Sequence, residues 1–128
     1  MHAPNILLVD DDDHKRELIA RSVLAKHPGV VLRQCSSGTE AIDYLRTTNA
    51  DAMVTDHNMT PINGIQLIDW VRRRFPRLPI LMITGNPEVE ADAIKAGANS
   101  VISSFRFSDV GDIIAKLIRD EGARGELA

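Results

Sequence analysis

Five short apolar segments punctuate the chain, and a stretch with helical periodicity follows each of them. They lie at 5–9, 30–35, 52–55, 80–84 and 100–103. The first, third and fourth are continuous apolar runs, which is typical of strands buried on both faces of a parallel sheet. The last is short and less apolar, as suits an edge strand. The pattern therefore predicts parallel strands covered by helices.

The intervening stretches carry signals for helix starts and stops. The first helix is expected over 14–27, because His27-Pro28-Gly29 ends it. Ser37-Gly38-Thr39-Glu40 has the form of a capping box and predicts the start of the second helix. Asn86-Pro87 predicts the start of the fourth, and Gly97 its end. In the last helix the apolar residues are spaced along a single stripe: Val110, Ile113, Ile114, Leu117 and Ile118.

Strict alternation of strands and helices predicts one α/β domain, a (βα)5 doubly wound, flavodoxin-like three-layer sandwich. The common strand order for such a sheet is 2-1-3-4-5, which places the first and third strands at the topological switch point. We expect the domain to span 1–121. Segment 122–128 lacks packing residues and is expected to be a tail or the start of a linker.

Composition narrows the class of protein. The chain has 128 residues, 44% of them apolar, with a net charge of −3 and a single cysteine, Cys35. An acidic balance argues against direct nucleic-acid binding, and a lone cysteine excludes an internal disulfide. No apolar run has the length of a signal peptide or membrane span. We therefore expect a cytoplasmic domain without a membrane anchor.

Acidic residues mark the predicted switch point. Asp10 and Asp11 follow the first strand, and Asp56 ends the third, so the three carboxylates are expected to converge. Adjacent carboxylates repel one another, and Mg²⁺, which prefers oxygen ligands, would relieve the repulsion. An exposed acidic turn that caps the next helix is the alternative, and we assign Asp12 and Asp13 to that role.

A hydroxyl group lies at the same predicted rim. Thr84 ends the fourth strand beside Gly85, where it could donate a hydrogen bond to a phosphoryl oxygen or serve as a turn residue ahead of Asn86. A carboxylate can hold a phosphoryl group as an acyl phosphate, with Mg²⁺ and a cation neutralising its charge.

In order and spacing, these motifs resemble the receiver domain of two-component response regulators over about 5–120. The marks are Asp10-Asp11, Asp56 followed by Asn58-Met59 and Gly64, Thr84-Gly85, and Ala96-Gly97-Ala98. The resemblance implies that Asp56 receives a phosphoryl group from a histidine kinase or phosphotransfer protein. It implies that Asp11, Asp56 and the backbone carbonyl of Asn58 bind Mg²⁺, with Asp10 acting through water, and that Thr84 moves to bond the phosphoryl group.

The resemblance also implies a signalling surface, made of the helix after Asn86-Pro87, the strand at 100–103 and the last helix. A downstream output protein or domain would read the switch there, and a homodimer could form through the same surface. No true enzyme activity is implied beyond the domain's own phosphorylation and dephosphorylation.

The chain departs from the family pattern after the fifth strand. The family carries a lysine followed by proline there, whereas this chain has Ser104 followed by Phe105. Serine supplies a hydrogen bond but no charge. We therefore expect the site to depend more on Mg²⁺, and one carboxylate pKa to be raised by its neighbours in the absence of metal. Lys15 or Arg106 could supply a substitute charge.

Two alternatives remain open. The missing lysine favours a pseudo-receiver, an interaction module without phosphorylation-dependent switching. Asp10-x-Asp12 after a strand also fits the nucleophile motif of aspartyl phosphatases of the haloacid-dehalogenase type, although His14 departs from that motif. Separately, Arg72-Arg73-Arg74 with Arg77 is expected to be a solvated helix end, or else a docking patch for an acidic partner.

Overall fold

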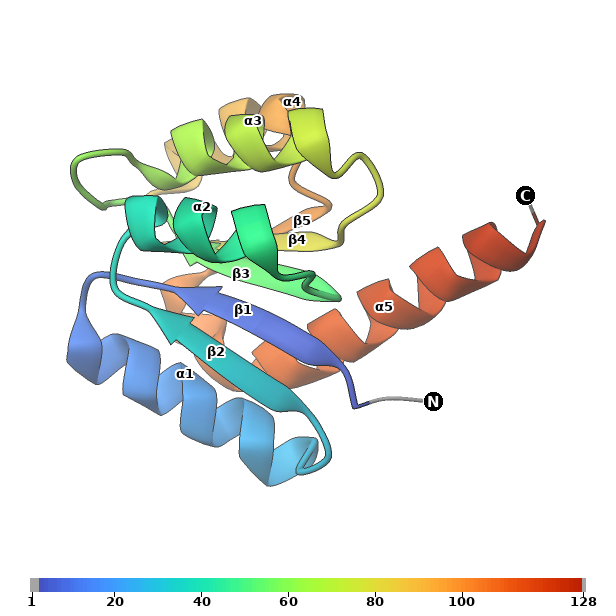
Figure 1. Cartoon of the computed structure of the whole chain (residues 1–128). Coiled ribbons are helices and arrows are strands. Elements are labelled where there is room, and N and C mark those ends of the chain that lie inside the picture. Colours follow the sequence, from blue (N-terminus) through green and yellow to red (C-terminus); the bar gives the residue numbers. More distant parts are fainter. Residues whose placement is uncertain (1–2, 128) are drawn as a thin grey trace.

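The computed structural model describes residues 3–127, with side chains through residue 124. Its centre is a five-stranded parallel sheet in the order β2-β1-β3-β4-β5, which confirms the predicted topology. The strands are β1 (Asn5–Val9), β2 (Val31–Cys35), β3 (Ala52–Asp56), β4 (Ile80–Thr84) and β5 (Ser100–Ser103). The α-helices are α1 (Asp13–Lys26), α2 (Gly38–Thr47), α3 (Gly64–Arg74), α4 (Glu90–Ala96) and α5 (Val110–Leu127). Figure 1 shows α2, α3 and α4 on one face of the sheet and α1 and α5 on the other.

Two apolar cores separate the layers, because successive residues of a strand point to opposite faces. In β1, Leu7 and Val9 join the core under α2, α3 and α4, whereas Ile6 and Leu8 join the core under α1 and α5. All four side chains are at most 2% exposed. The unbroken apolar run in β1 thus arises because both of its faces are covered, as predicted for an interior strand.

Helix starts differ in detail from the sequence patterns. The Ser37 hydroxyl accepts a hydrogen bond from Glu40 N at 3.1 Å, but the Glu40 carboxylate accepts from Ser36, so only half of the expected capping box forms. The complete capping box is at the start of α3, between Asn63 and Gln66. Asn86-Pro87 opens a short 3₁₀ turn, η1 (Pro87–Val89), ahead of α4 rather than α4 itself. A second such turn, η2 (Ser104–Asp109), precedes α5.

The last helix is longer than the sequence suggested. Helical backbone continues past Glu121 to Leu127, where we had expected a frayed segment. Glu121 forms an ion pair with Arg77 on the α3–β4 connection and another with Arg124 one turn later in α5. The first pair connects this part of α5 to the rest of the domain. The assignment of 122–128 to a tail or linker stays a prediction, and Ala128 lies outside the described residues. None of the helices in the described part of the chain is both long enough and apolar enough to span a membrane.

The arginine cluster at the end of α3 is only partly solvated. Arg72 donates to the carbonyl oxygen of Gly97 at 2.7 and 3.1 Å and to that of Phe75 at 3.0 Å. It therefore ties α3 to the turn between α4 and β5, and the prediction of a solvated helix end is wrong for this residue. The guanidinium of Arg74 lies 4.1 Å from the centre of the Trp70 ring, in cation–π geometry.

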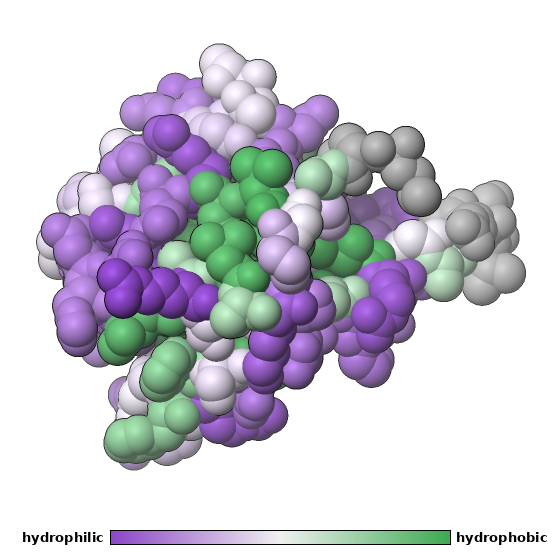
Figure 2. Space-filling model, turned by 90° about the horizontal axis from the view of Figure 1, so that it is seen from below, coloured by the Kyte–Doolittle hydropathy of each residue, from purple (hydrophilic) through white to green (hydrophobic). Residues whose placement is uncertain are grey.

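The face formed by α1 and α5 carries an apolar patch. Figure 2, which views the molecule from below, shows apolar side chains gathered among polar ones on this face. A hollow of about 210 Å³ lies there, and its apolar lining includes Ile6, Val23, Val30, Ile114 and Ile118. Exposed patches of this kind on small domains often serve as contact surfaces.

Gly64 permits the close approach of α3 to the end of β3. A Cβ atom at this position would lie 2.1 Å from the Asp56 carbonyl oxygen and 2.9 Å from His57 Cα. Both are backbone atoms, so Gly64→Ala must displace the segment that carries Asp56. We expect the free energy of unfolding to fall by roughly 1–3 kcal/mol in urea titrations. Gly122→Ala, where an added Cβ meets nothing within 4 Å, is the control and should be neutral or stabilising. Equal stability of the two variants would contradict this account.

Candidate functional site

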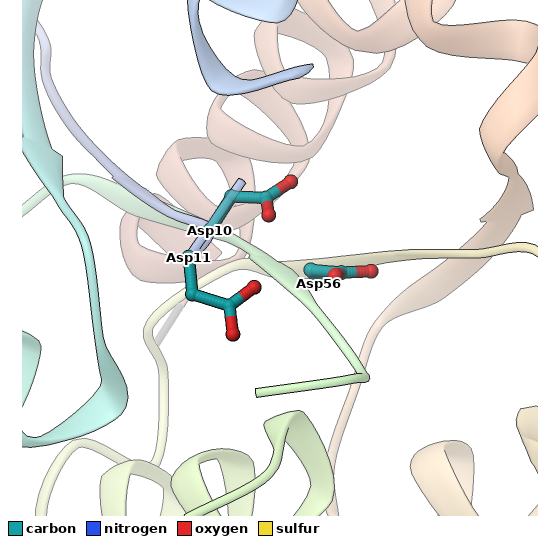
Figure 3. A group of neighbouring side chains, drawn as sticks. All are labelled: Asp10, Asp11 and Asp56. Carbon is teal, nitrogen blue, oxygen red and sulfur yellow. The ribbon is translucent and has the colours of Figure 1, made fainter. Parts of the chain in front are cut away.

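Three carboxylates meet where β1 and β3 end. The two strands are parallel neighbours, with Val9 opposite Thr55 in register, so the residues that follow Val9 lie beside Asp56. Oxygen atoms of Asp10, Asp11 and Asp56 all lie within 4.8 Å of one another (Figure 3). The structure thus brings together the three acids that the sequence placed at the switch point.

The three acids differ in environment. Asp10 is 1% exposed, Asp56 is partly buried and Asp11 is exposed. Asp10 Oδ1 accepts a hydrogen bond from Asp12 N at 3.0 Å, whereas its buried Oδ2 has no hydrogen-bond partner. Burial raises the pKa of Asp10, and the negative charges of Asp56 and Asp11 add to the increase. A raised carboxylate pKa was expected, but burial contributes more to it than the neighbouring charges.

Lys15 brings a positive charge to the acids. From the first turn of α1, its ammonium donates to Asp56 Oδ1 at 3.0 Å and lies 3.6 Å from Asp10 Oδ2. Burial acts to lower the pKa of Lys15. The hydrogen bond to Asp56 and the negative charges of Asp56 and Asp10 act in the opposite direction and are stronger together, so the pKa is raised. Lys15 is therefore charged at neutral pH. Lys15 is one of the two substitute cations that the sequence suggested, and it contacts two of the three acids.

The other candidate cation does not reach the site. The Arg106 guanidinium is exposed and bonds to Asp109 at 2.9 Å within η2. Ser104 is partly buried and lies near the end of β4. Its hydroxyl oxygen would be 3.9 Å from a Cβ atom added to Gly85, the residue that follows β4. Of the two substitutes suggested by the sequence, Lys15 is the one in contact with the acids.

Asp12 and Asp13 start the first helix, as predicted. Asp12 is the N-cap, and its carboxylate accepts from Lys15 N at 3.1 Å. Asp13 lies in the first turn and pairs with Arg16 at 2.8 Å. Since Asp12 caps a helix, it is not placed as the second acid of a phosphatase pair with Asp10.

Thr84 has the turn role rather than a contact with the acids. It is 4% exposed, and its hydroxyl oxygen accepts a hydrogen bond from Asn86 N at 3.0 Å. Asn58, whose carbonyl the family resemblance assigns to metal, follows Asp56 by two positions and is exposed. Val101 is partly buried and packs against the core beneath α3 and α4.

The donor set suits a hard divalent cation. In the described part of the chain, the group of possible metal ligands consists of the three aspartates and contains neither histidine nor cysteine. Carboxylate oxygens, one of them buried without a hydrogen bond, are ligands that Mg²⁺ accepts and that softer metals prefer less.

Comparison with known proteins identifies the family. The family model for the response regulator receiver domain matches residues 6–115. The chain belongs to this family.

The relatives that match this receiver domain are of two kinds. The chemotaxis protein CheY of Pseudomonas aeruginosa is 34% identical over 88% of this chain and 94% of its own length. A CheY homolog of Campylobacter jejuni is 36% identical over 76% of this chain and 78% of its own. In contrast, the match to the transcriptional regulator NtrC of Klebsiella pneumoniae covers 66% of this chain and only 18% of that protein. The chain thus spans about a fifth of the length of these longer relatives.

Solved structures agree with the fold. The response regulator TrrA of Thermotoga maritima, in complex with Mg²⁺ and BeF, has a TM-score of 0.80 at 25% identity, over 89% of this chain and 98% of that one. A CheY-like receiver domain from Methanospirillum hungatei has a TM-score of 0.86 at 18% identity, over 95% and 98% of the two chains. The second likeness concerns the fold alone.

The charge of Asp10 should destabilise the metal-free protein. Its pKa is raised from an ordinary value of 3.8, so the folded state binds this proton more tightly than the unfolded chain. The destabilisation is present above the raised pKa and disappears as the pH falls through it. We expect Asp10→Asn to increase the free energy of unfolding at pH 7 by about 1 kcal/mol in the presence of chelator.

Urea unfolding at several pH values measures this difference, which should shrink as the pH approaches the ordinary aspartate range. Asp11→Asn removes an exposed charge from the same cluster and should have a smaller effect. A destabilised Asp10→Asn protein at pH 7 would contradict the assignment.

Proposed function

We propose that this receiver domain is a phosphoacceptor, with Asp56 as the residue that takes the phosphoryl group from a histidine kinase or phosphotransfer protein. The observation that carries the proposal is the convergence of Asp10, Asp11 and Asp56 within 4.8 Å at the ends of β1 and β3. Family membership and the partial exposure of Asp56 support it.

The reaction is a displacement at phosphorus. A carboxylate oxygen of Asp56 forms the new P–O bond while the P–N bond of the donor phosphohistidine breaks. The electron pair of that bond stays with the imidazole nitrogen, which a proton neutralises, and the product is an acyl phosphate. Because the transferred group carries negative charge into a cluster of acids, catalysis depends on positioning and on counter-charge.

Residues that would hold Mg²⁺ are present in this chain. Asp11, Asp56 and the backbone carbonyl of Asn58 would be its ligands, and Asp10 would act through water. Bound Mg²⁺ would neutralise charge on the phosphoryl oxygens. The buried Oδ2 of Asp10, which has no hydrogen bond, supports this assignment because a bound cation would compensate it.

Signal output is assigned to the surface of α4, β5 and α5. Thr84 ends β4 with its hydroxyl on Asn86 N, directly ahead of η1 and α4. Transfer of that hydroxyl to a phosphoryl oxygen would release the turn and alter this surface. Downstream output proteins or domains would bind there, and a homodimer could use the same surface.

Phosphorylation of Asp56 can be tested directly. Incubation with acetyl phosphate and Mg²⁺ should produce a singly phosphorylated species, detected by mass spectrometry and by phosphate-affinity electrophoresis. Asp56→Asn should abolish it, because the amide is not a nucleophile in this reaction. Asp43→Asn, which removes an exposed carboxylate on α2, should leave it unchanged. A phosphorylated species that persists in Asp56→Asn would refute Asp56 as the acceptor.

Metal binding has an independent readout in stability. A ligand that binds only the folded state stabilises it by RT ln(1 + [Mg²⁺]/Kd), which is about 1.4 kcal/mol at ten times Kd. We expect millimolar Mg²⁺ to increase the free energy of unfolding of the wild type, and Asp11→Asn to lose this increase. Asp13→Asn removes the same charge from a residue that faces Arg16 and should keep it. No response of the wild type to millimolar Mg²⁺ would contradict the metal assignment.

A pseudo-receiver is the second candidate. One observation favours it: Ser104 supplies no charge where the family carries a lysine. A pseudo-receiver would bind its partner whether or not a phosphoryl donor is present. Absence of any phosphorylated species at all donor and metal concentrations would support it.

A further inference from the structure

We propose that Lys15 is the cation of the phosphorylation site and takes the place of the lysine that this chain lacks after β5. The inference rests on the proposed phosphorylation of Asp56. It assigns the positive charge to the first turn of α1 rather than to the residue that follows β5.

The contact geometry supports this role. The Lys15 ammonium donates to Asp56 Oδ1 at 3.0 Å and lies 3.6 Å from Asp10 Oδ2. That second oxygen is buried and has no hydrogen-bond partner, so Lys15 supplies its nearest compensating charge. Among the side chains that the structure describes, Lys15 is the one that forms ion pairs with members of the acid cluster.

The position of Lys15 is fixed by the chain around it. Asp10 Oδ1 accepts a hydrogen bond from Asp12 N. The Asp12 carboxylate in turn accepts one from Lys15 N and so caps α1. Arg16 donates to the Asp10 carbonyl oxygen at 2.7 Å and to Gln34 on β2 at 3.1 Å. These bonds anchor the first turn of α1 to the ends of β1 and β2. The ammonium is therefore presented to Asp56 from an ordered backbone.

A cation at this position has a clear chemical use. The carboxylate of Asp56 becomes an acyl phosphate, and the ammonium beside it is close enough to donate to an oxygen of the new group. In the free protein the same ammonium lies beside two of the three acids, Asp56 and Asp10, and offsets their charge. Lys15 would thus exchange a carboxylate partner for a phosphoryl partner without leaving the pocket.

The test removes the ammonium at position 15 and then introduces one at position 104. Lys15→Met keeps the length and apolar stem but removes the ammonium. The rates of phosphorylation by acetyl phosphate and the affinity for beryllofluoride, both in Mg²⁺, should fall roughly 10- to 100-fold, as expected for loss of a charge-assisted hydrogen bond. The affinity for Mg²⁺ alone should stay equal or increase, because a competing cation has gone. Lys15→Arg should retain most of the phosphorylation rate and most of the affinity for beryllofluoride.

Two further variants serve as controls. Lys116→Met removes the same charge from an exposed pair with Asp120 on α5 and should behave as the wild type. Ser104→Lys, introduced into Lys15→Met, places an ammonium at the end of β5 and should recover part of the lost affinity for beryllofluoride. Recovery of this kind is not expected if Lys15 only maintains the fold.

The outcomes separate the inference from the function on which it rests. If the wild type is phosphorylated and Lys15→Met matches it, Lys15 has no such role and the proposed function stands. If Lys15→Met loses affinity for Mg²⁺ as well, its role is structural and the inference is overturned. If the wild type neither reacts nor binds beryllofluoride, the proposed function fails and the inference fails with it.

Discussion

The repulsion among three carboxylates at one junction of the sheet constrains the rest of the site. Parallel neighbours β1 and β3 end together, so the sheet register holds the backbones that carry Asp10, Asp11 and Asp56 close to one another. Burial increases the difficulty, because the pKa of Asp10 is raised chiefly by loss of water. A positive charge must therefore come from elsewhere in the chain or from solution. The contact of Lys15 with Asp56 is the chain's contribution.

The fold could be predicted from sequence because each local signal agreed with the same arrangement. β1, β4 and β5 begin and end at the residues that the apolar runs indicated, and the strand order followed from chain crossover rules. Helix starts were less certain, since several polar residues can cap. The Ser37 motif matched the pattern, yet the Glu40 carboxylate bonds to Ser36. The complete capping box lies instead between Asn63 and Gln66.

The acid cluster was predictable, whereas for its counter-charge the sequence offered two candidates, Lys15 and Arg106, and could not choose between them. Asp10, Asp11 and Asp56 occupy strand ends, and strand ends are located by topology alone. Lys15 reaches Asp56 across 41 positions of sequence through a flexible side chain, and its direction depends on how Asp12 caps α1. One signal was available: a residue three positions after an N-cap lies in the first helical turn, close to the strand that precedes it. That signal could place Lys15 near the pocket but could not orient its ammonium.

Phosphoryl transfer needs positive charge beside the transferred group, and more than one element of the fold can supply it. In the proposed arrangement the first turn of α1 supplies the ammonium to Asp56, whereas the family pattern places it after the fifth strand. The two solutions differ in what they couple. A cation after β5 connects the phosphoryl group to the surface formed with α4 and α5. In the role proposed for it, Lys15 would connect the phosphoryl group to α1, which packs against α5 across the second core. The proposed exchange would therefore change the helix to which the phosphoryl group is coupled.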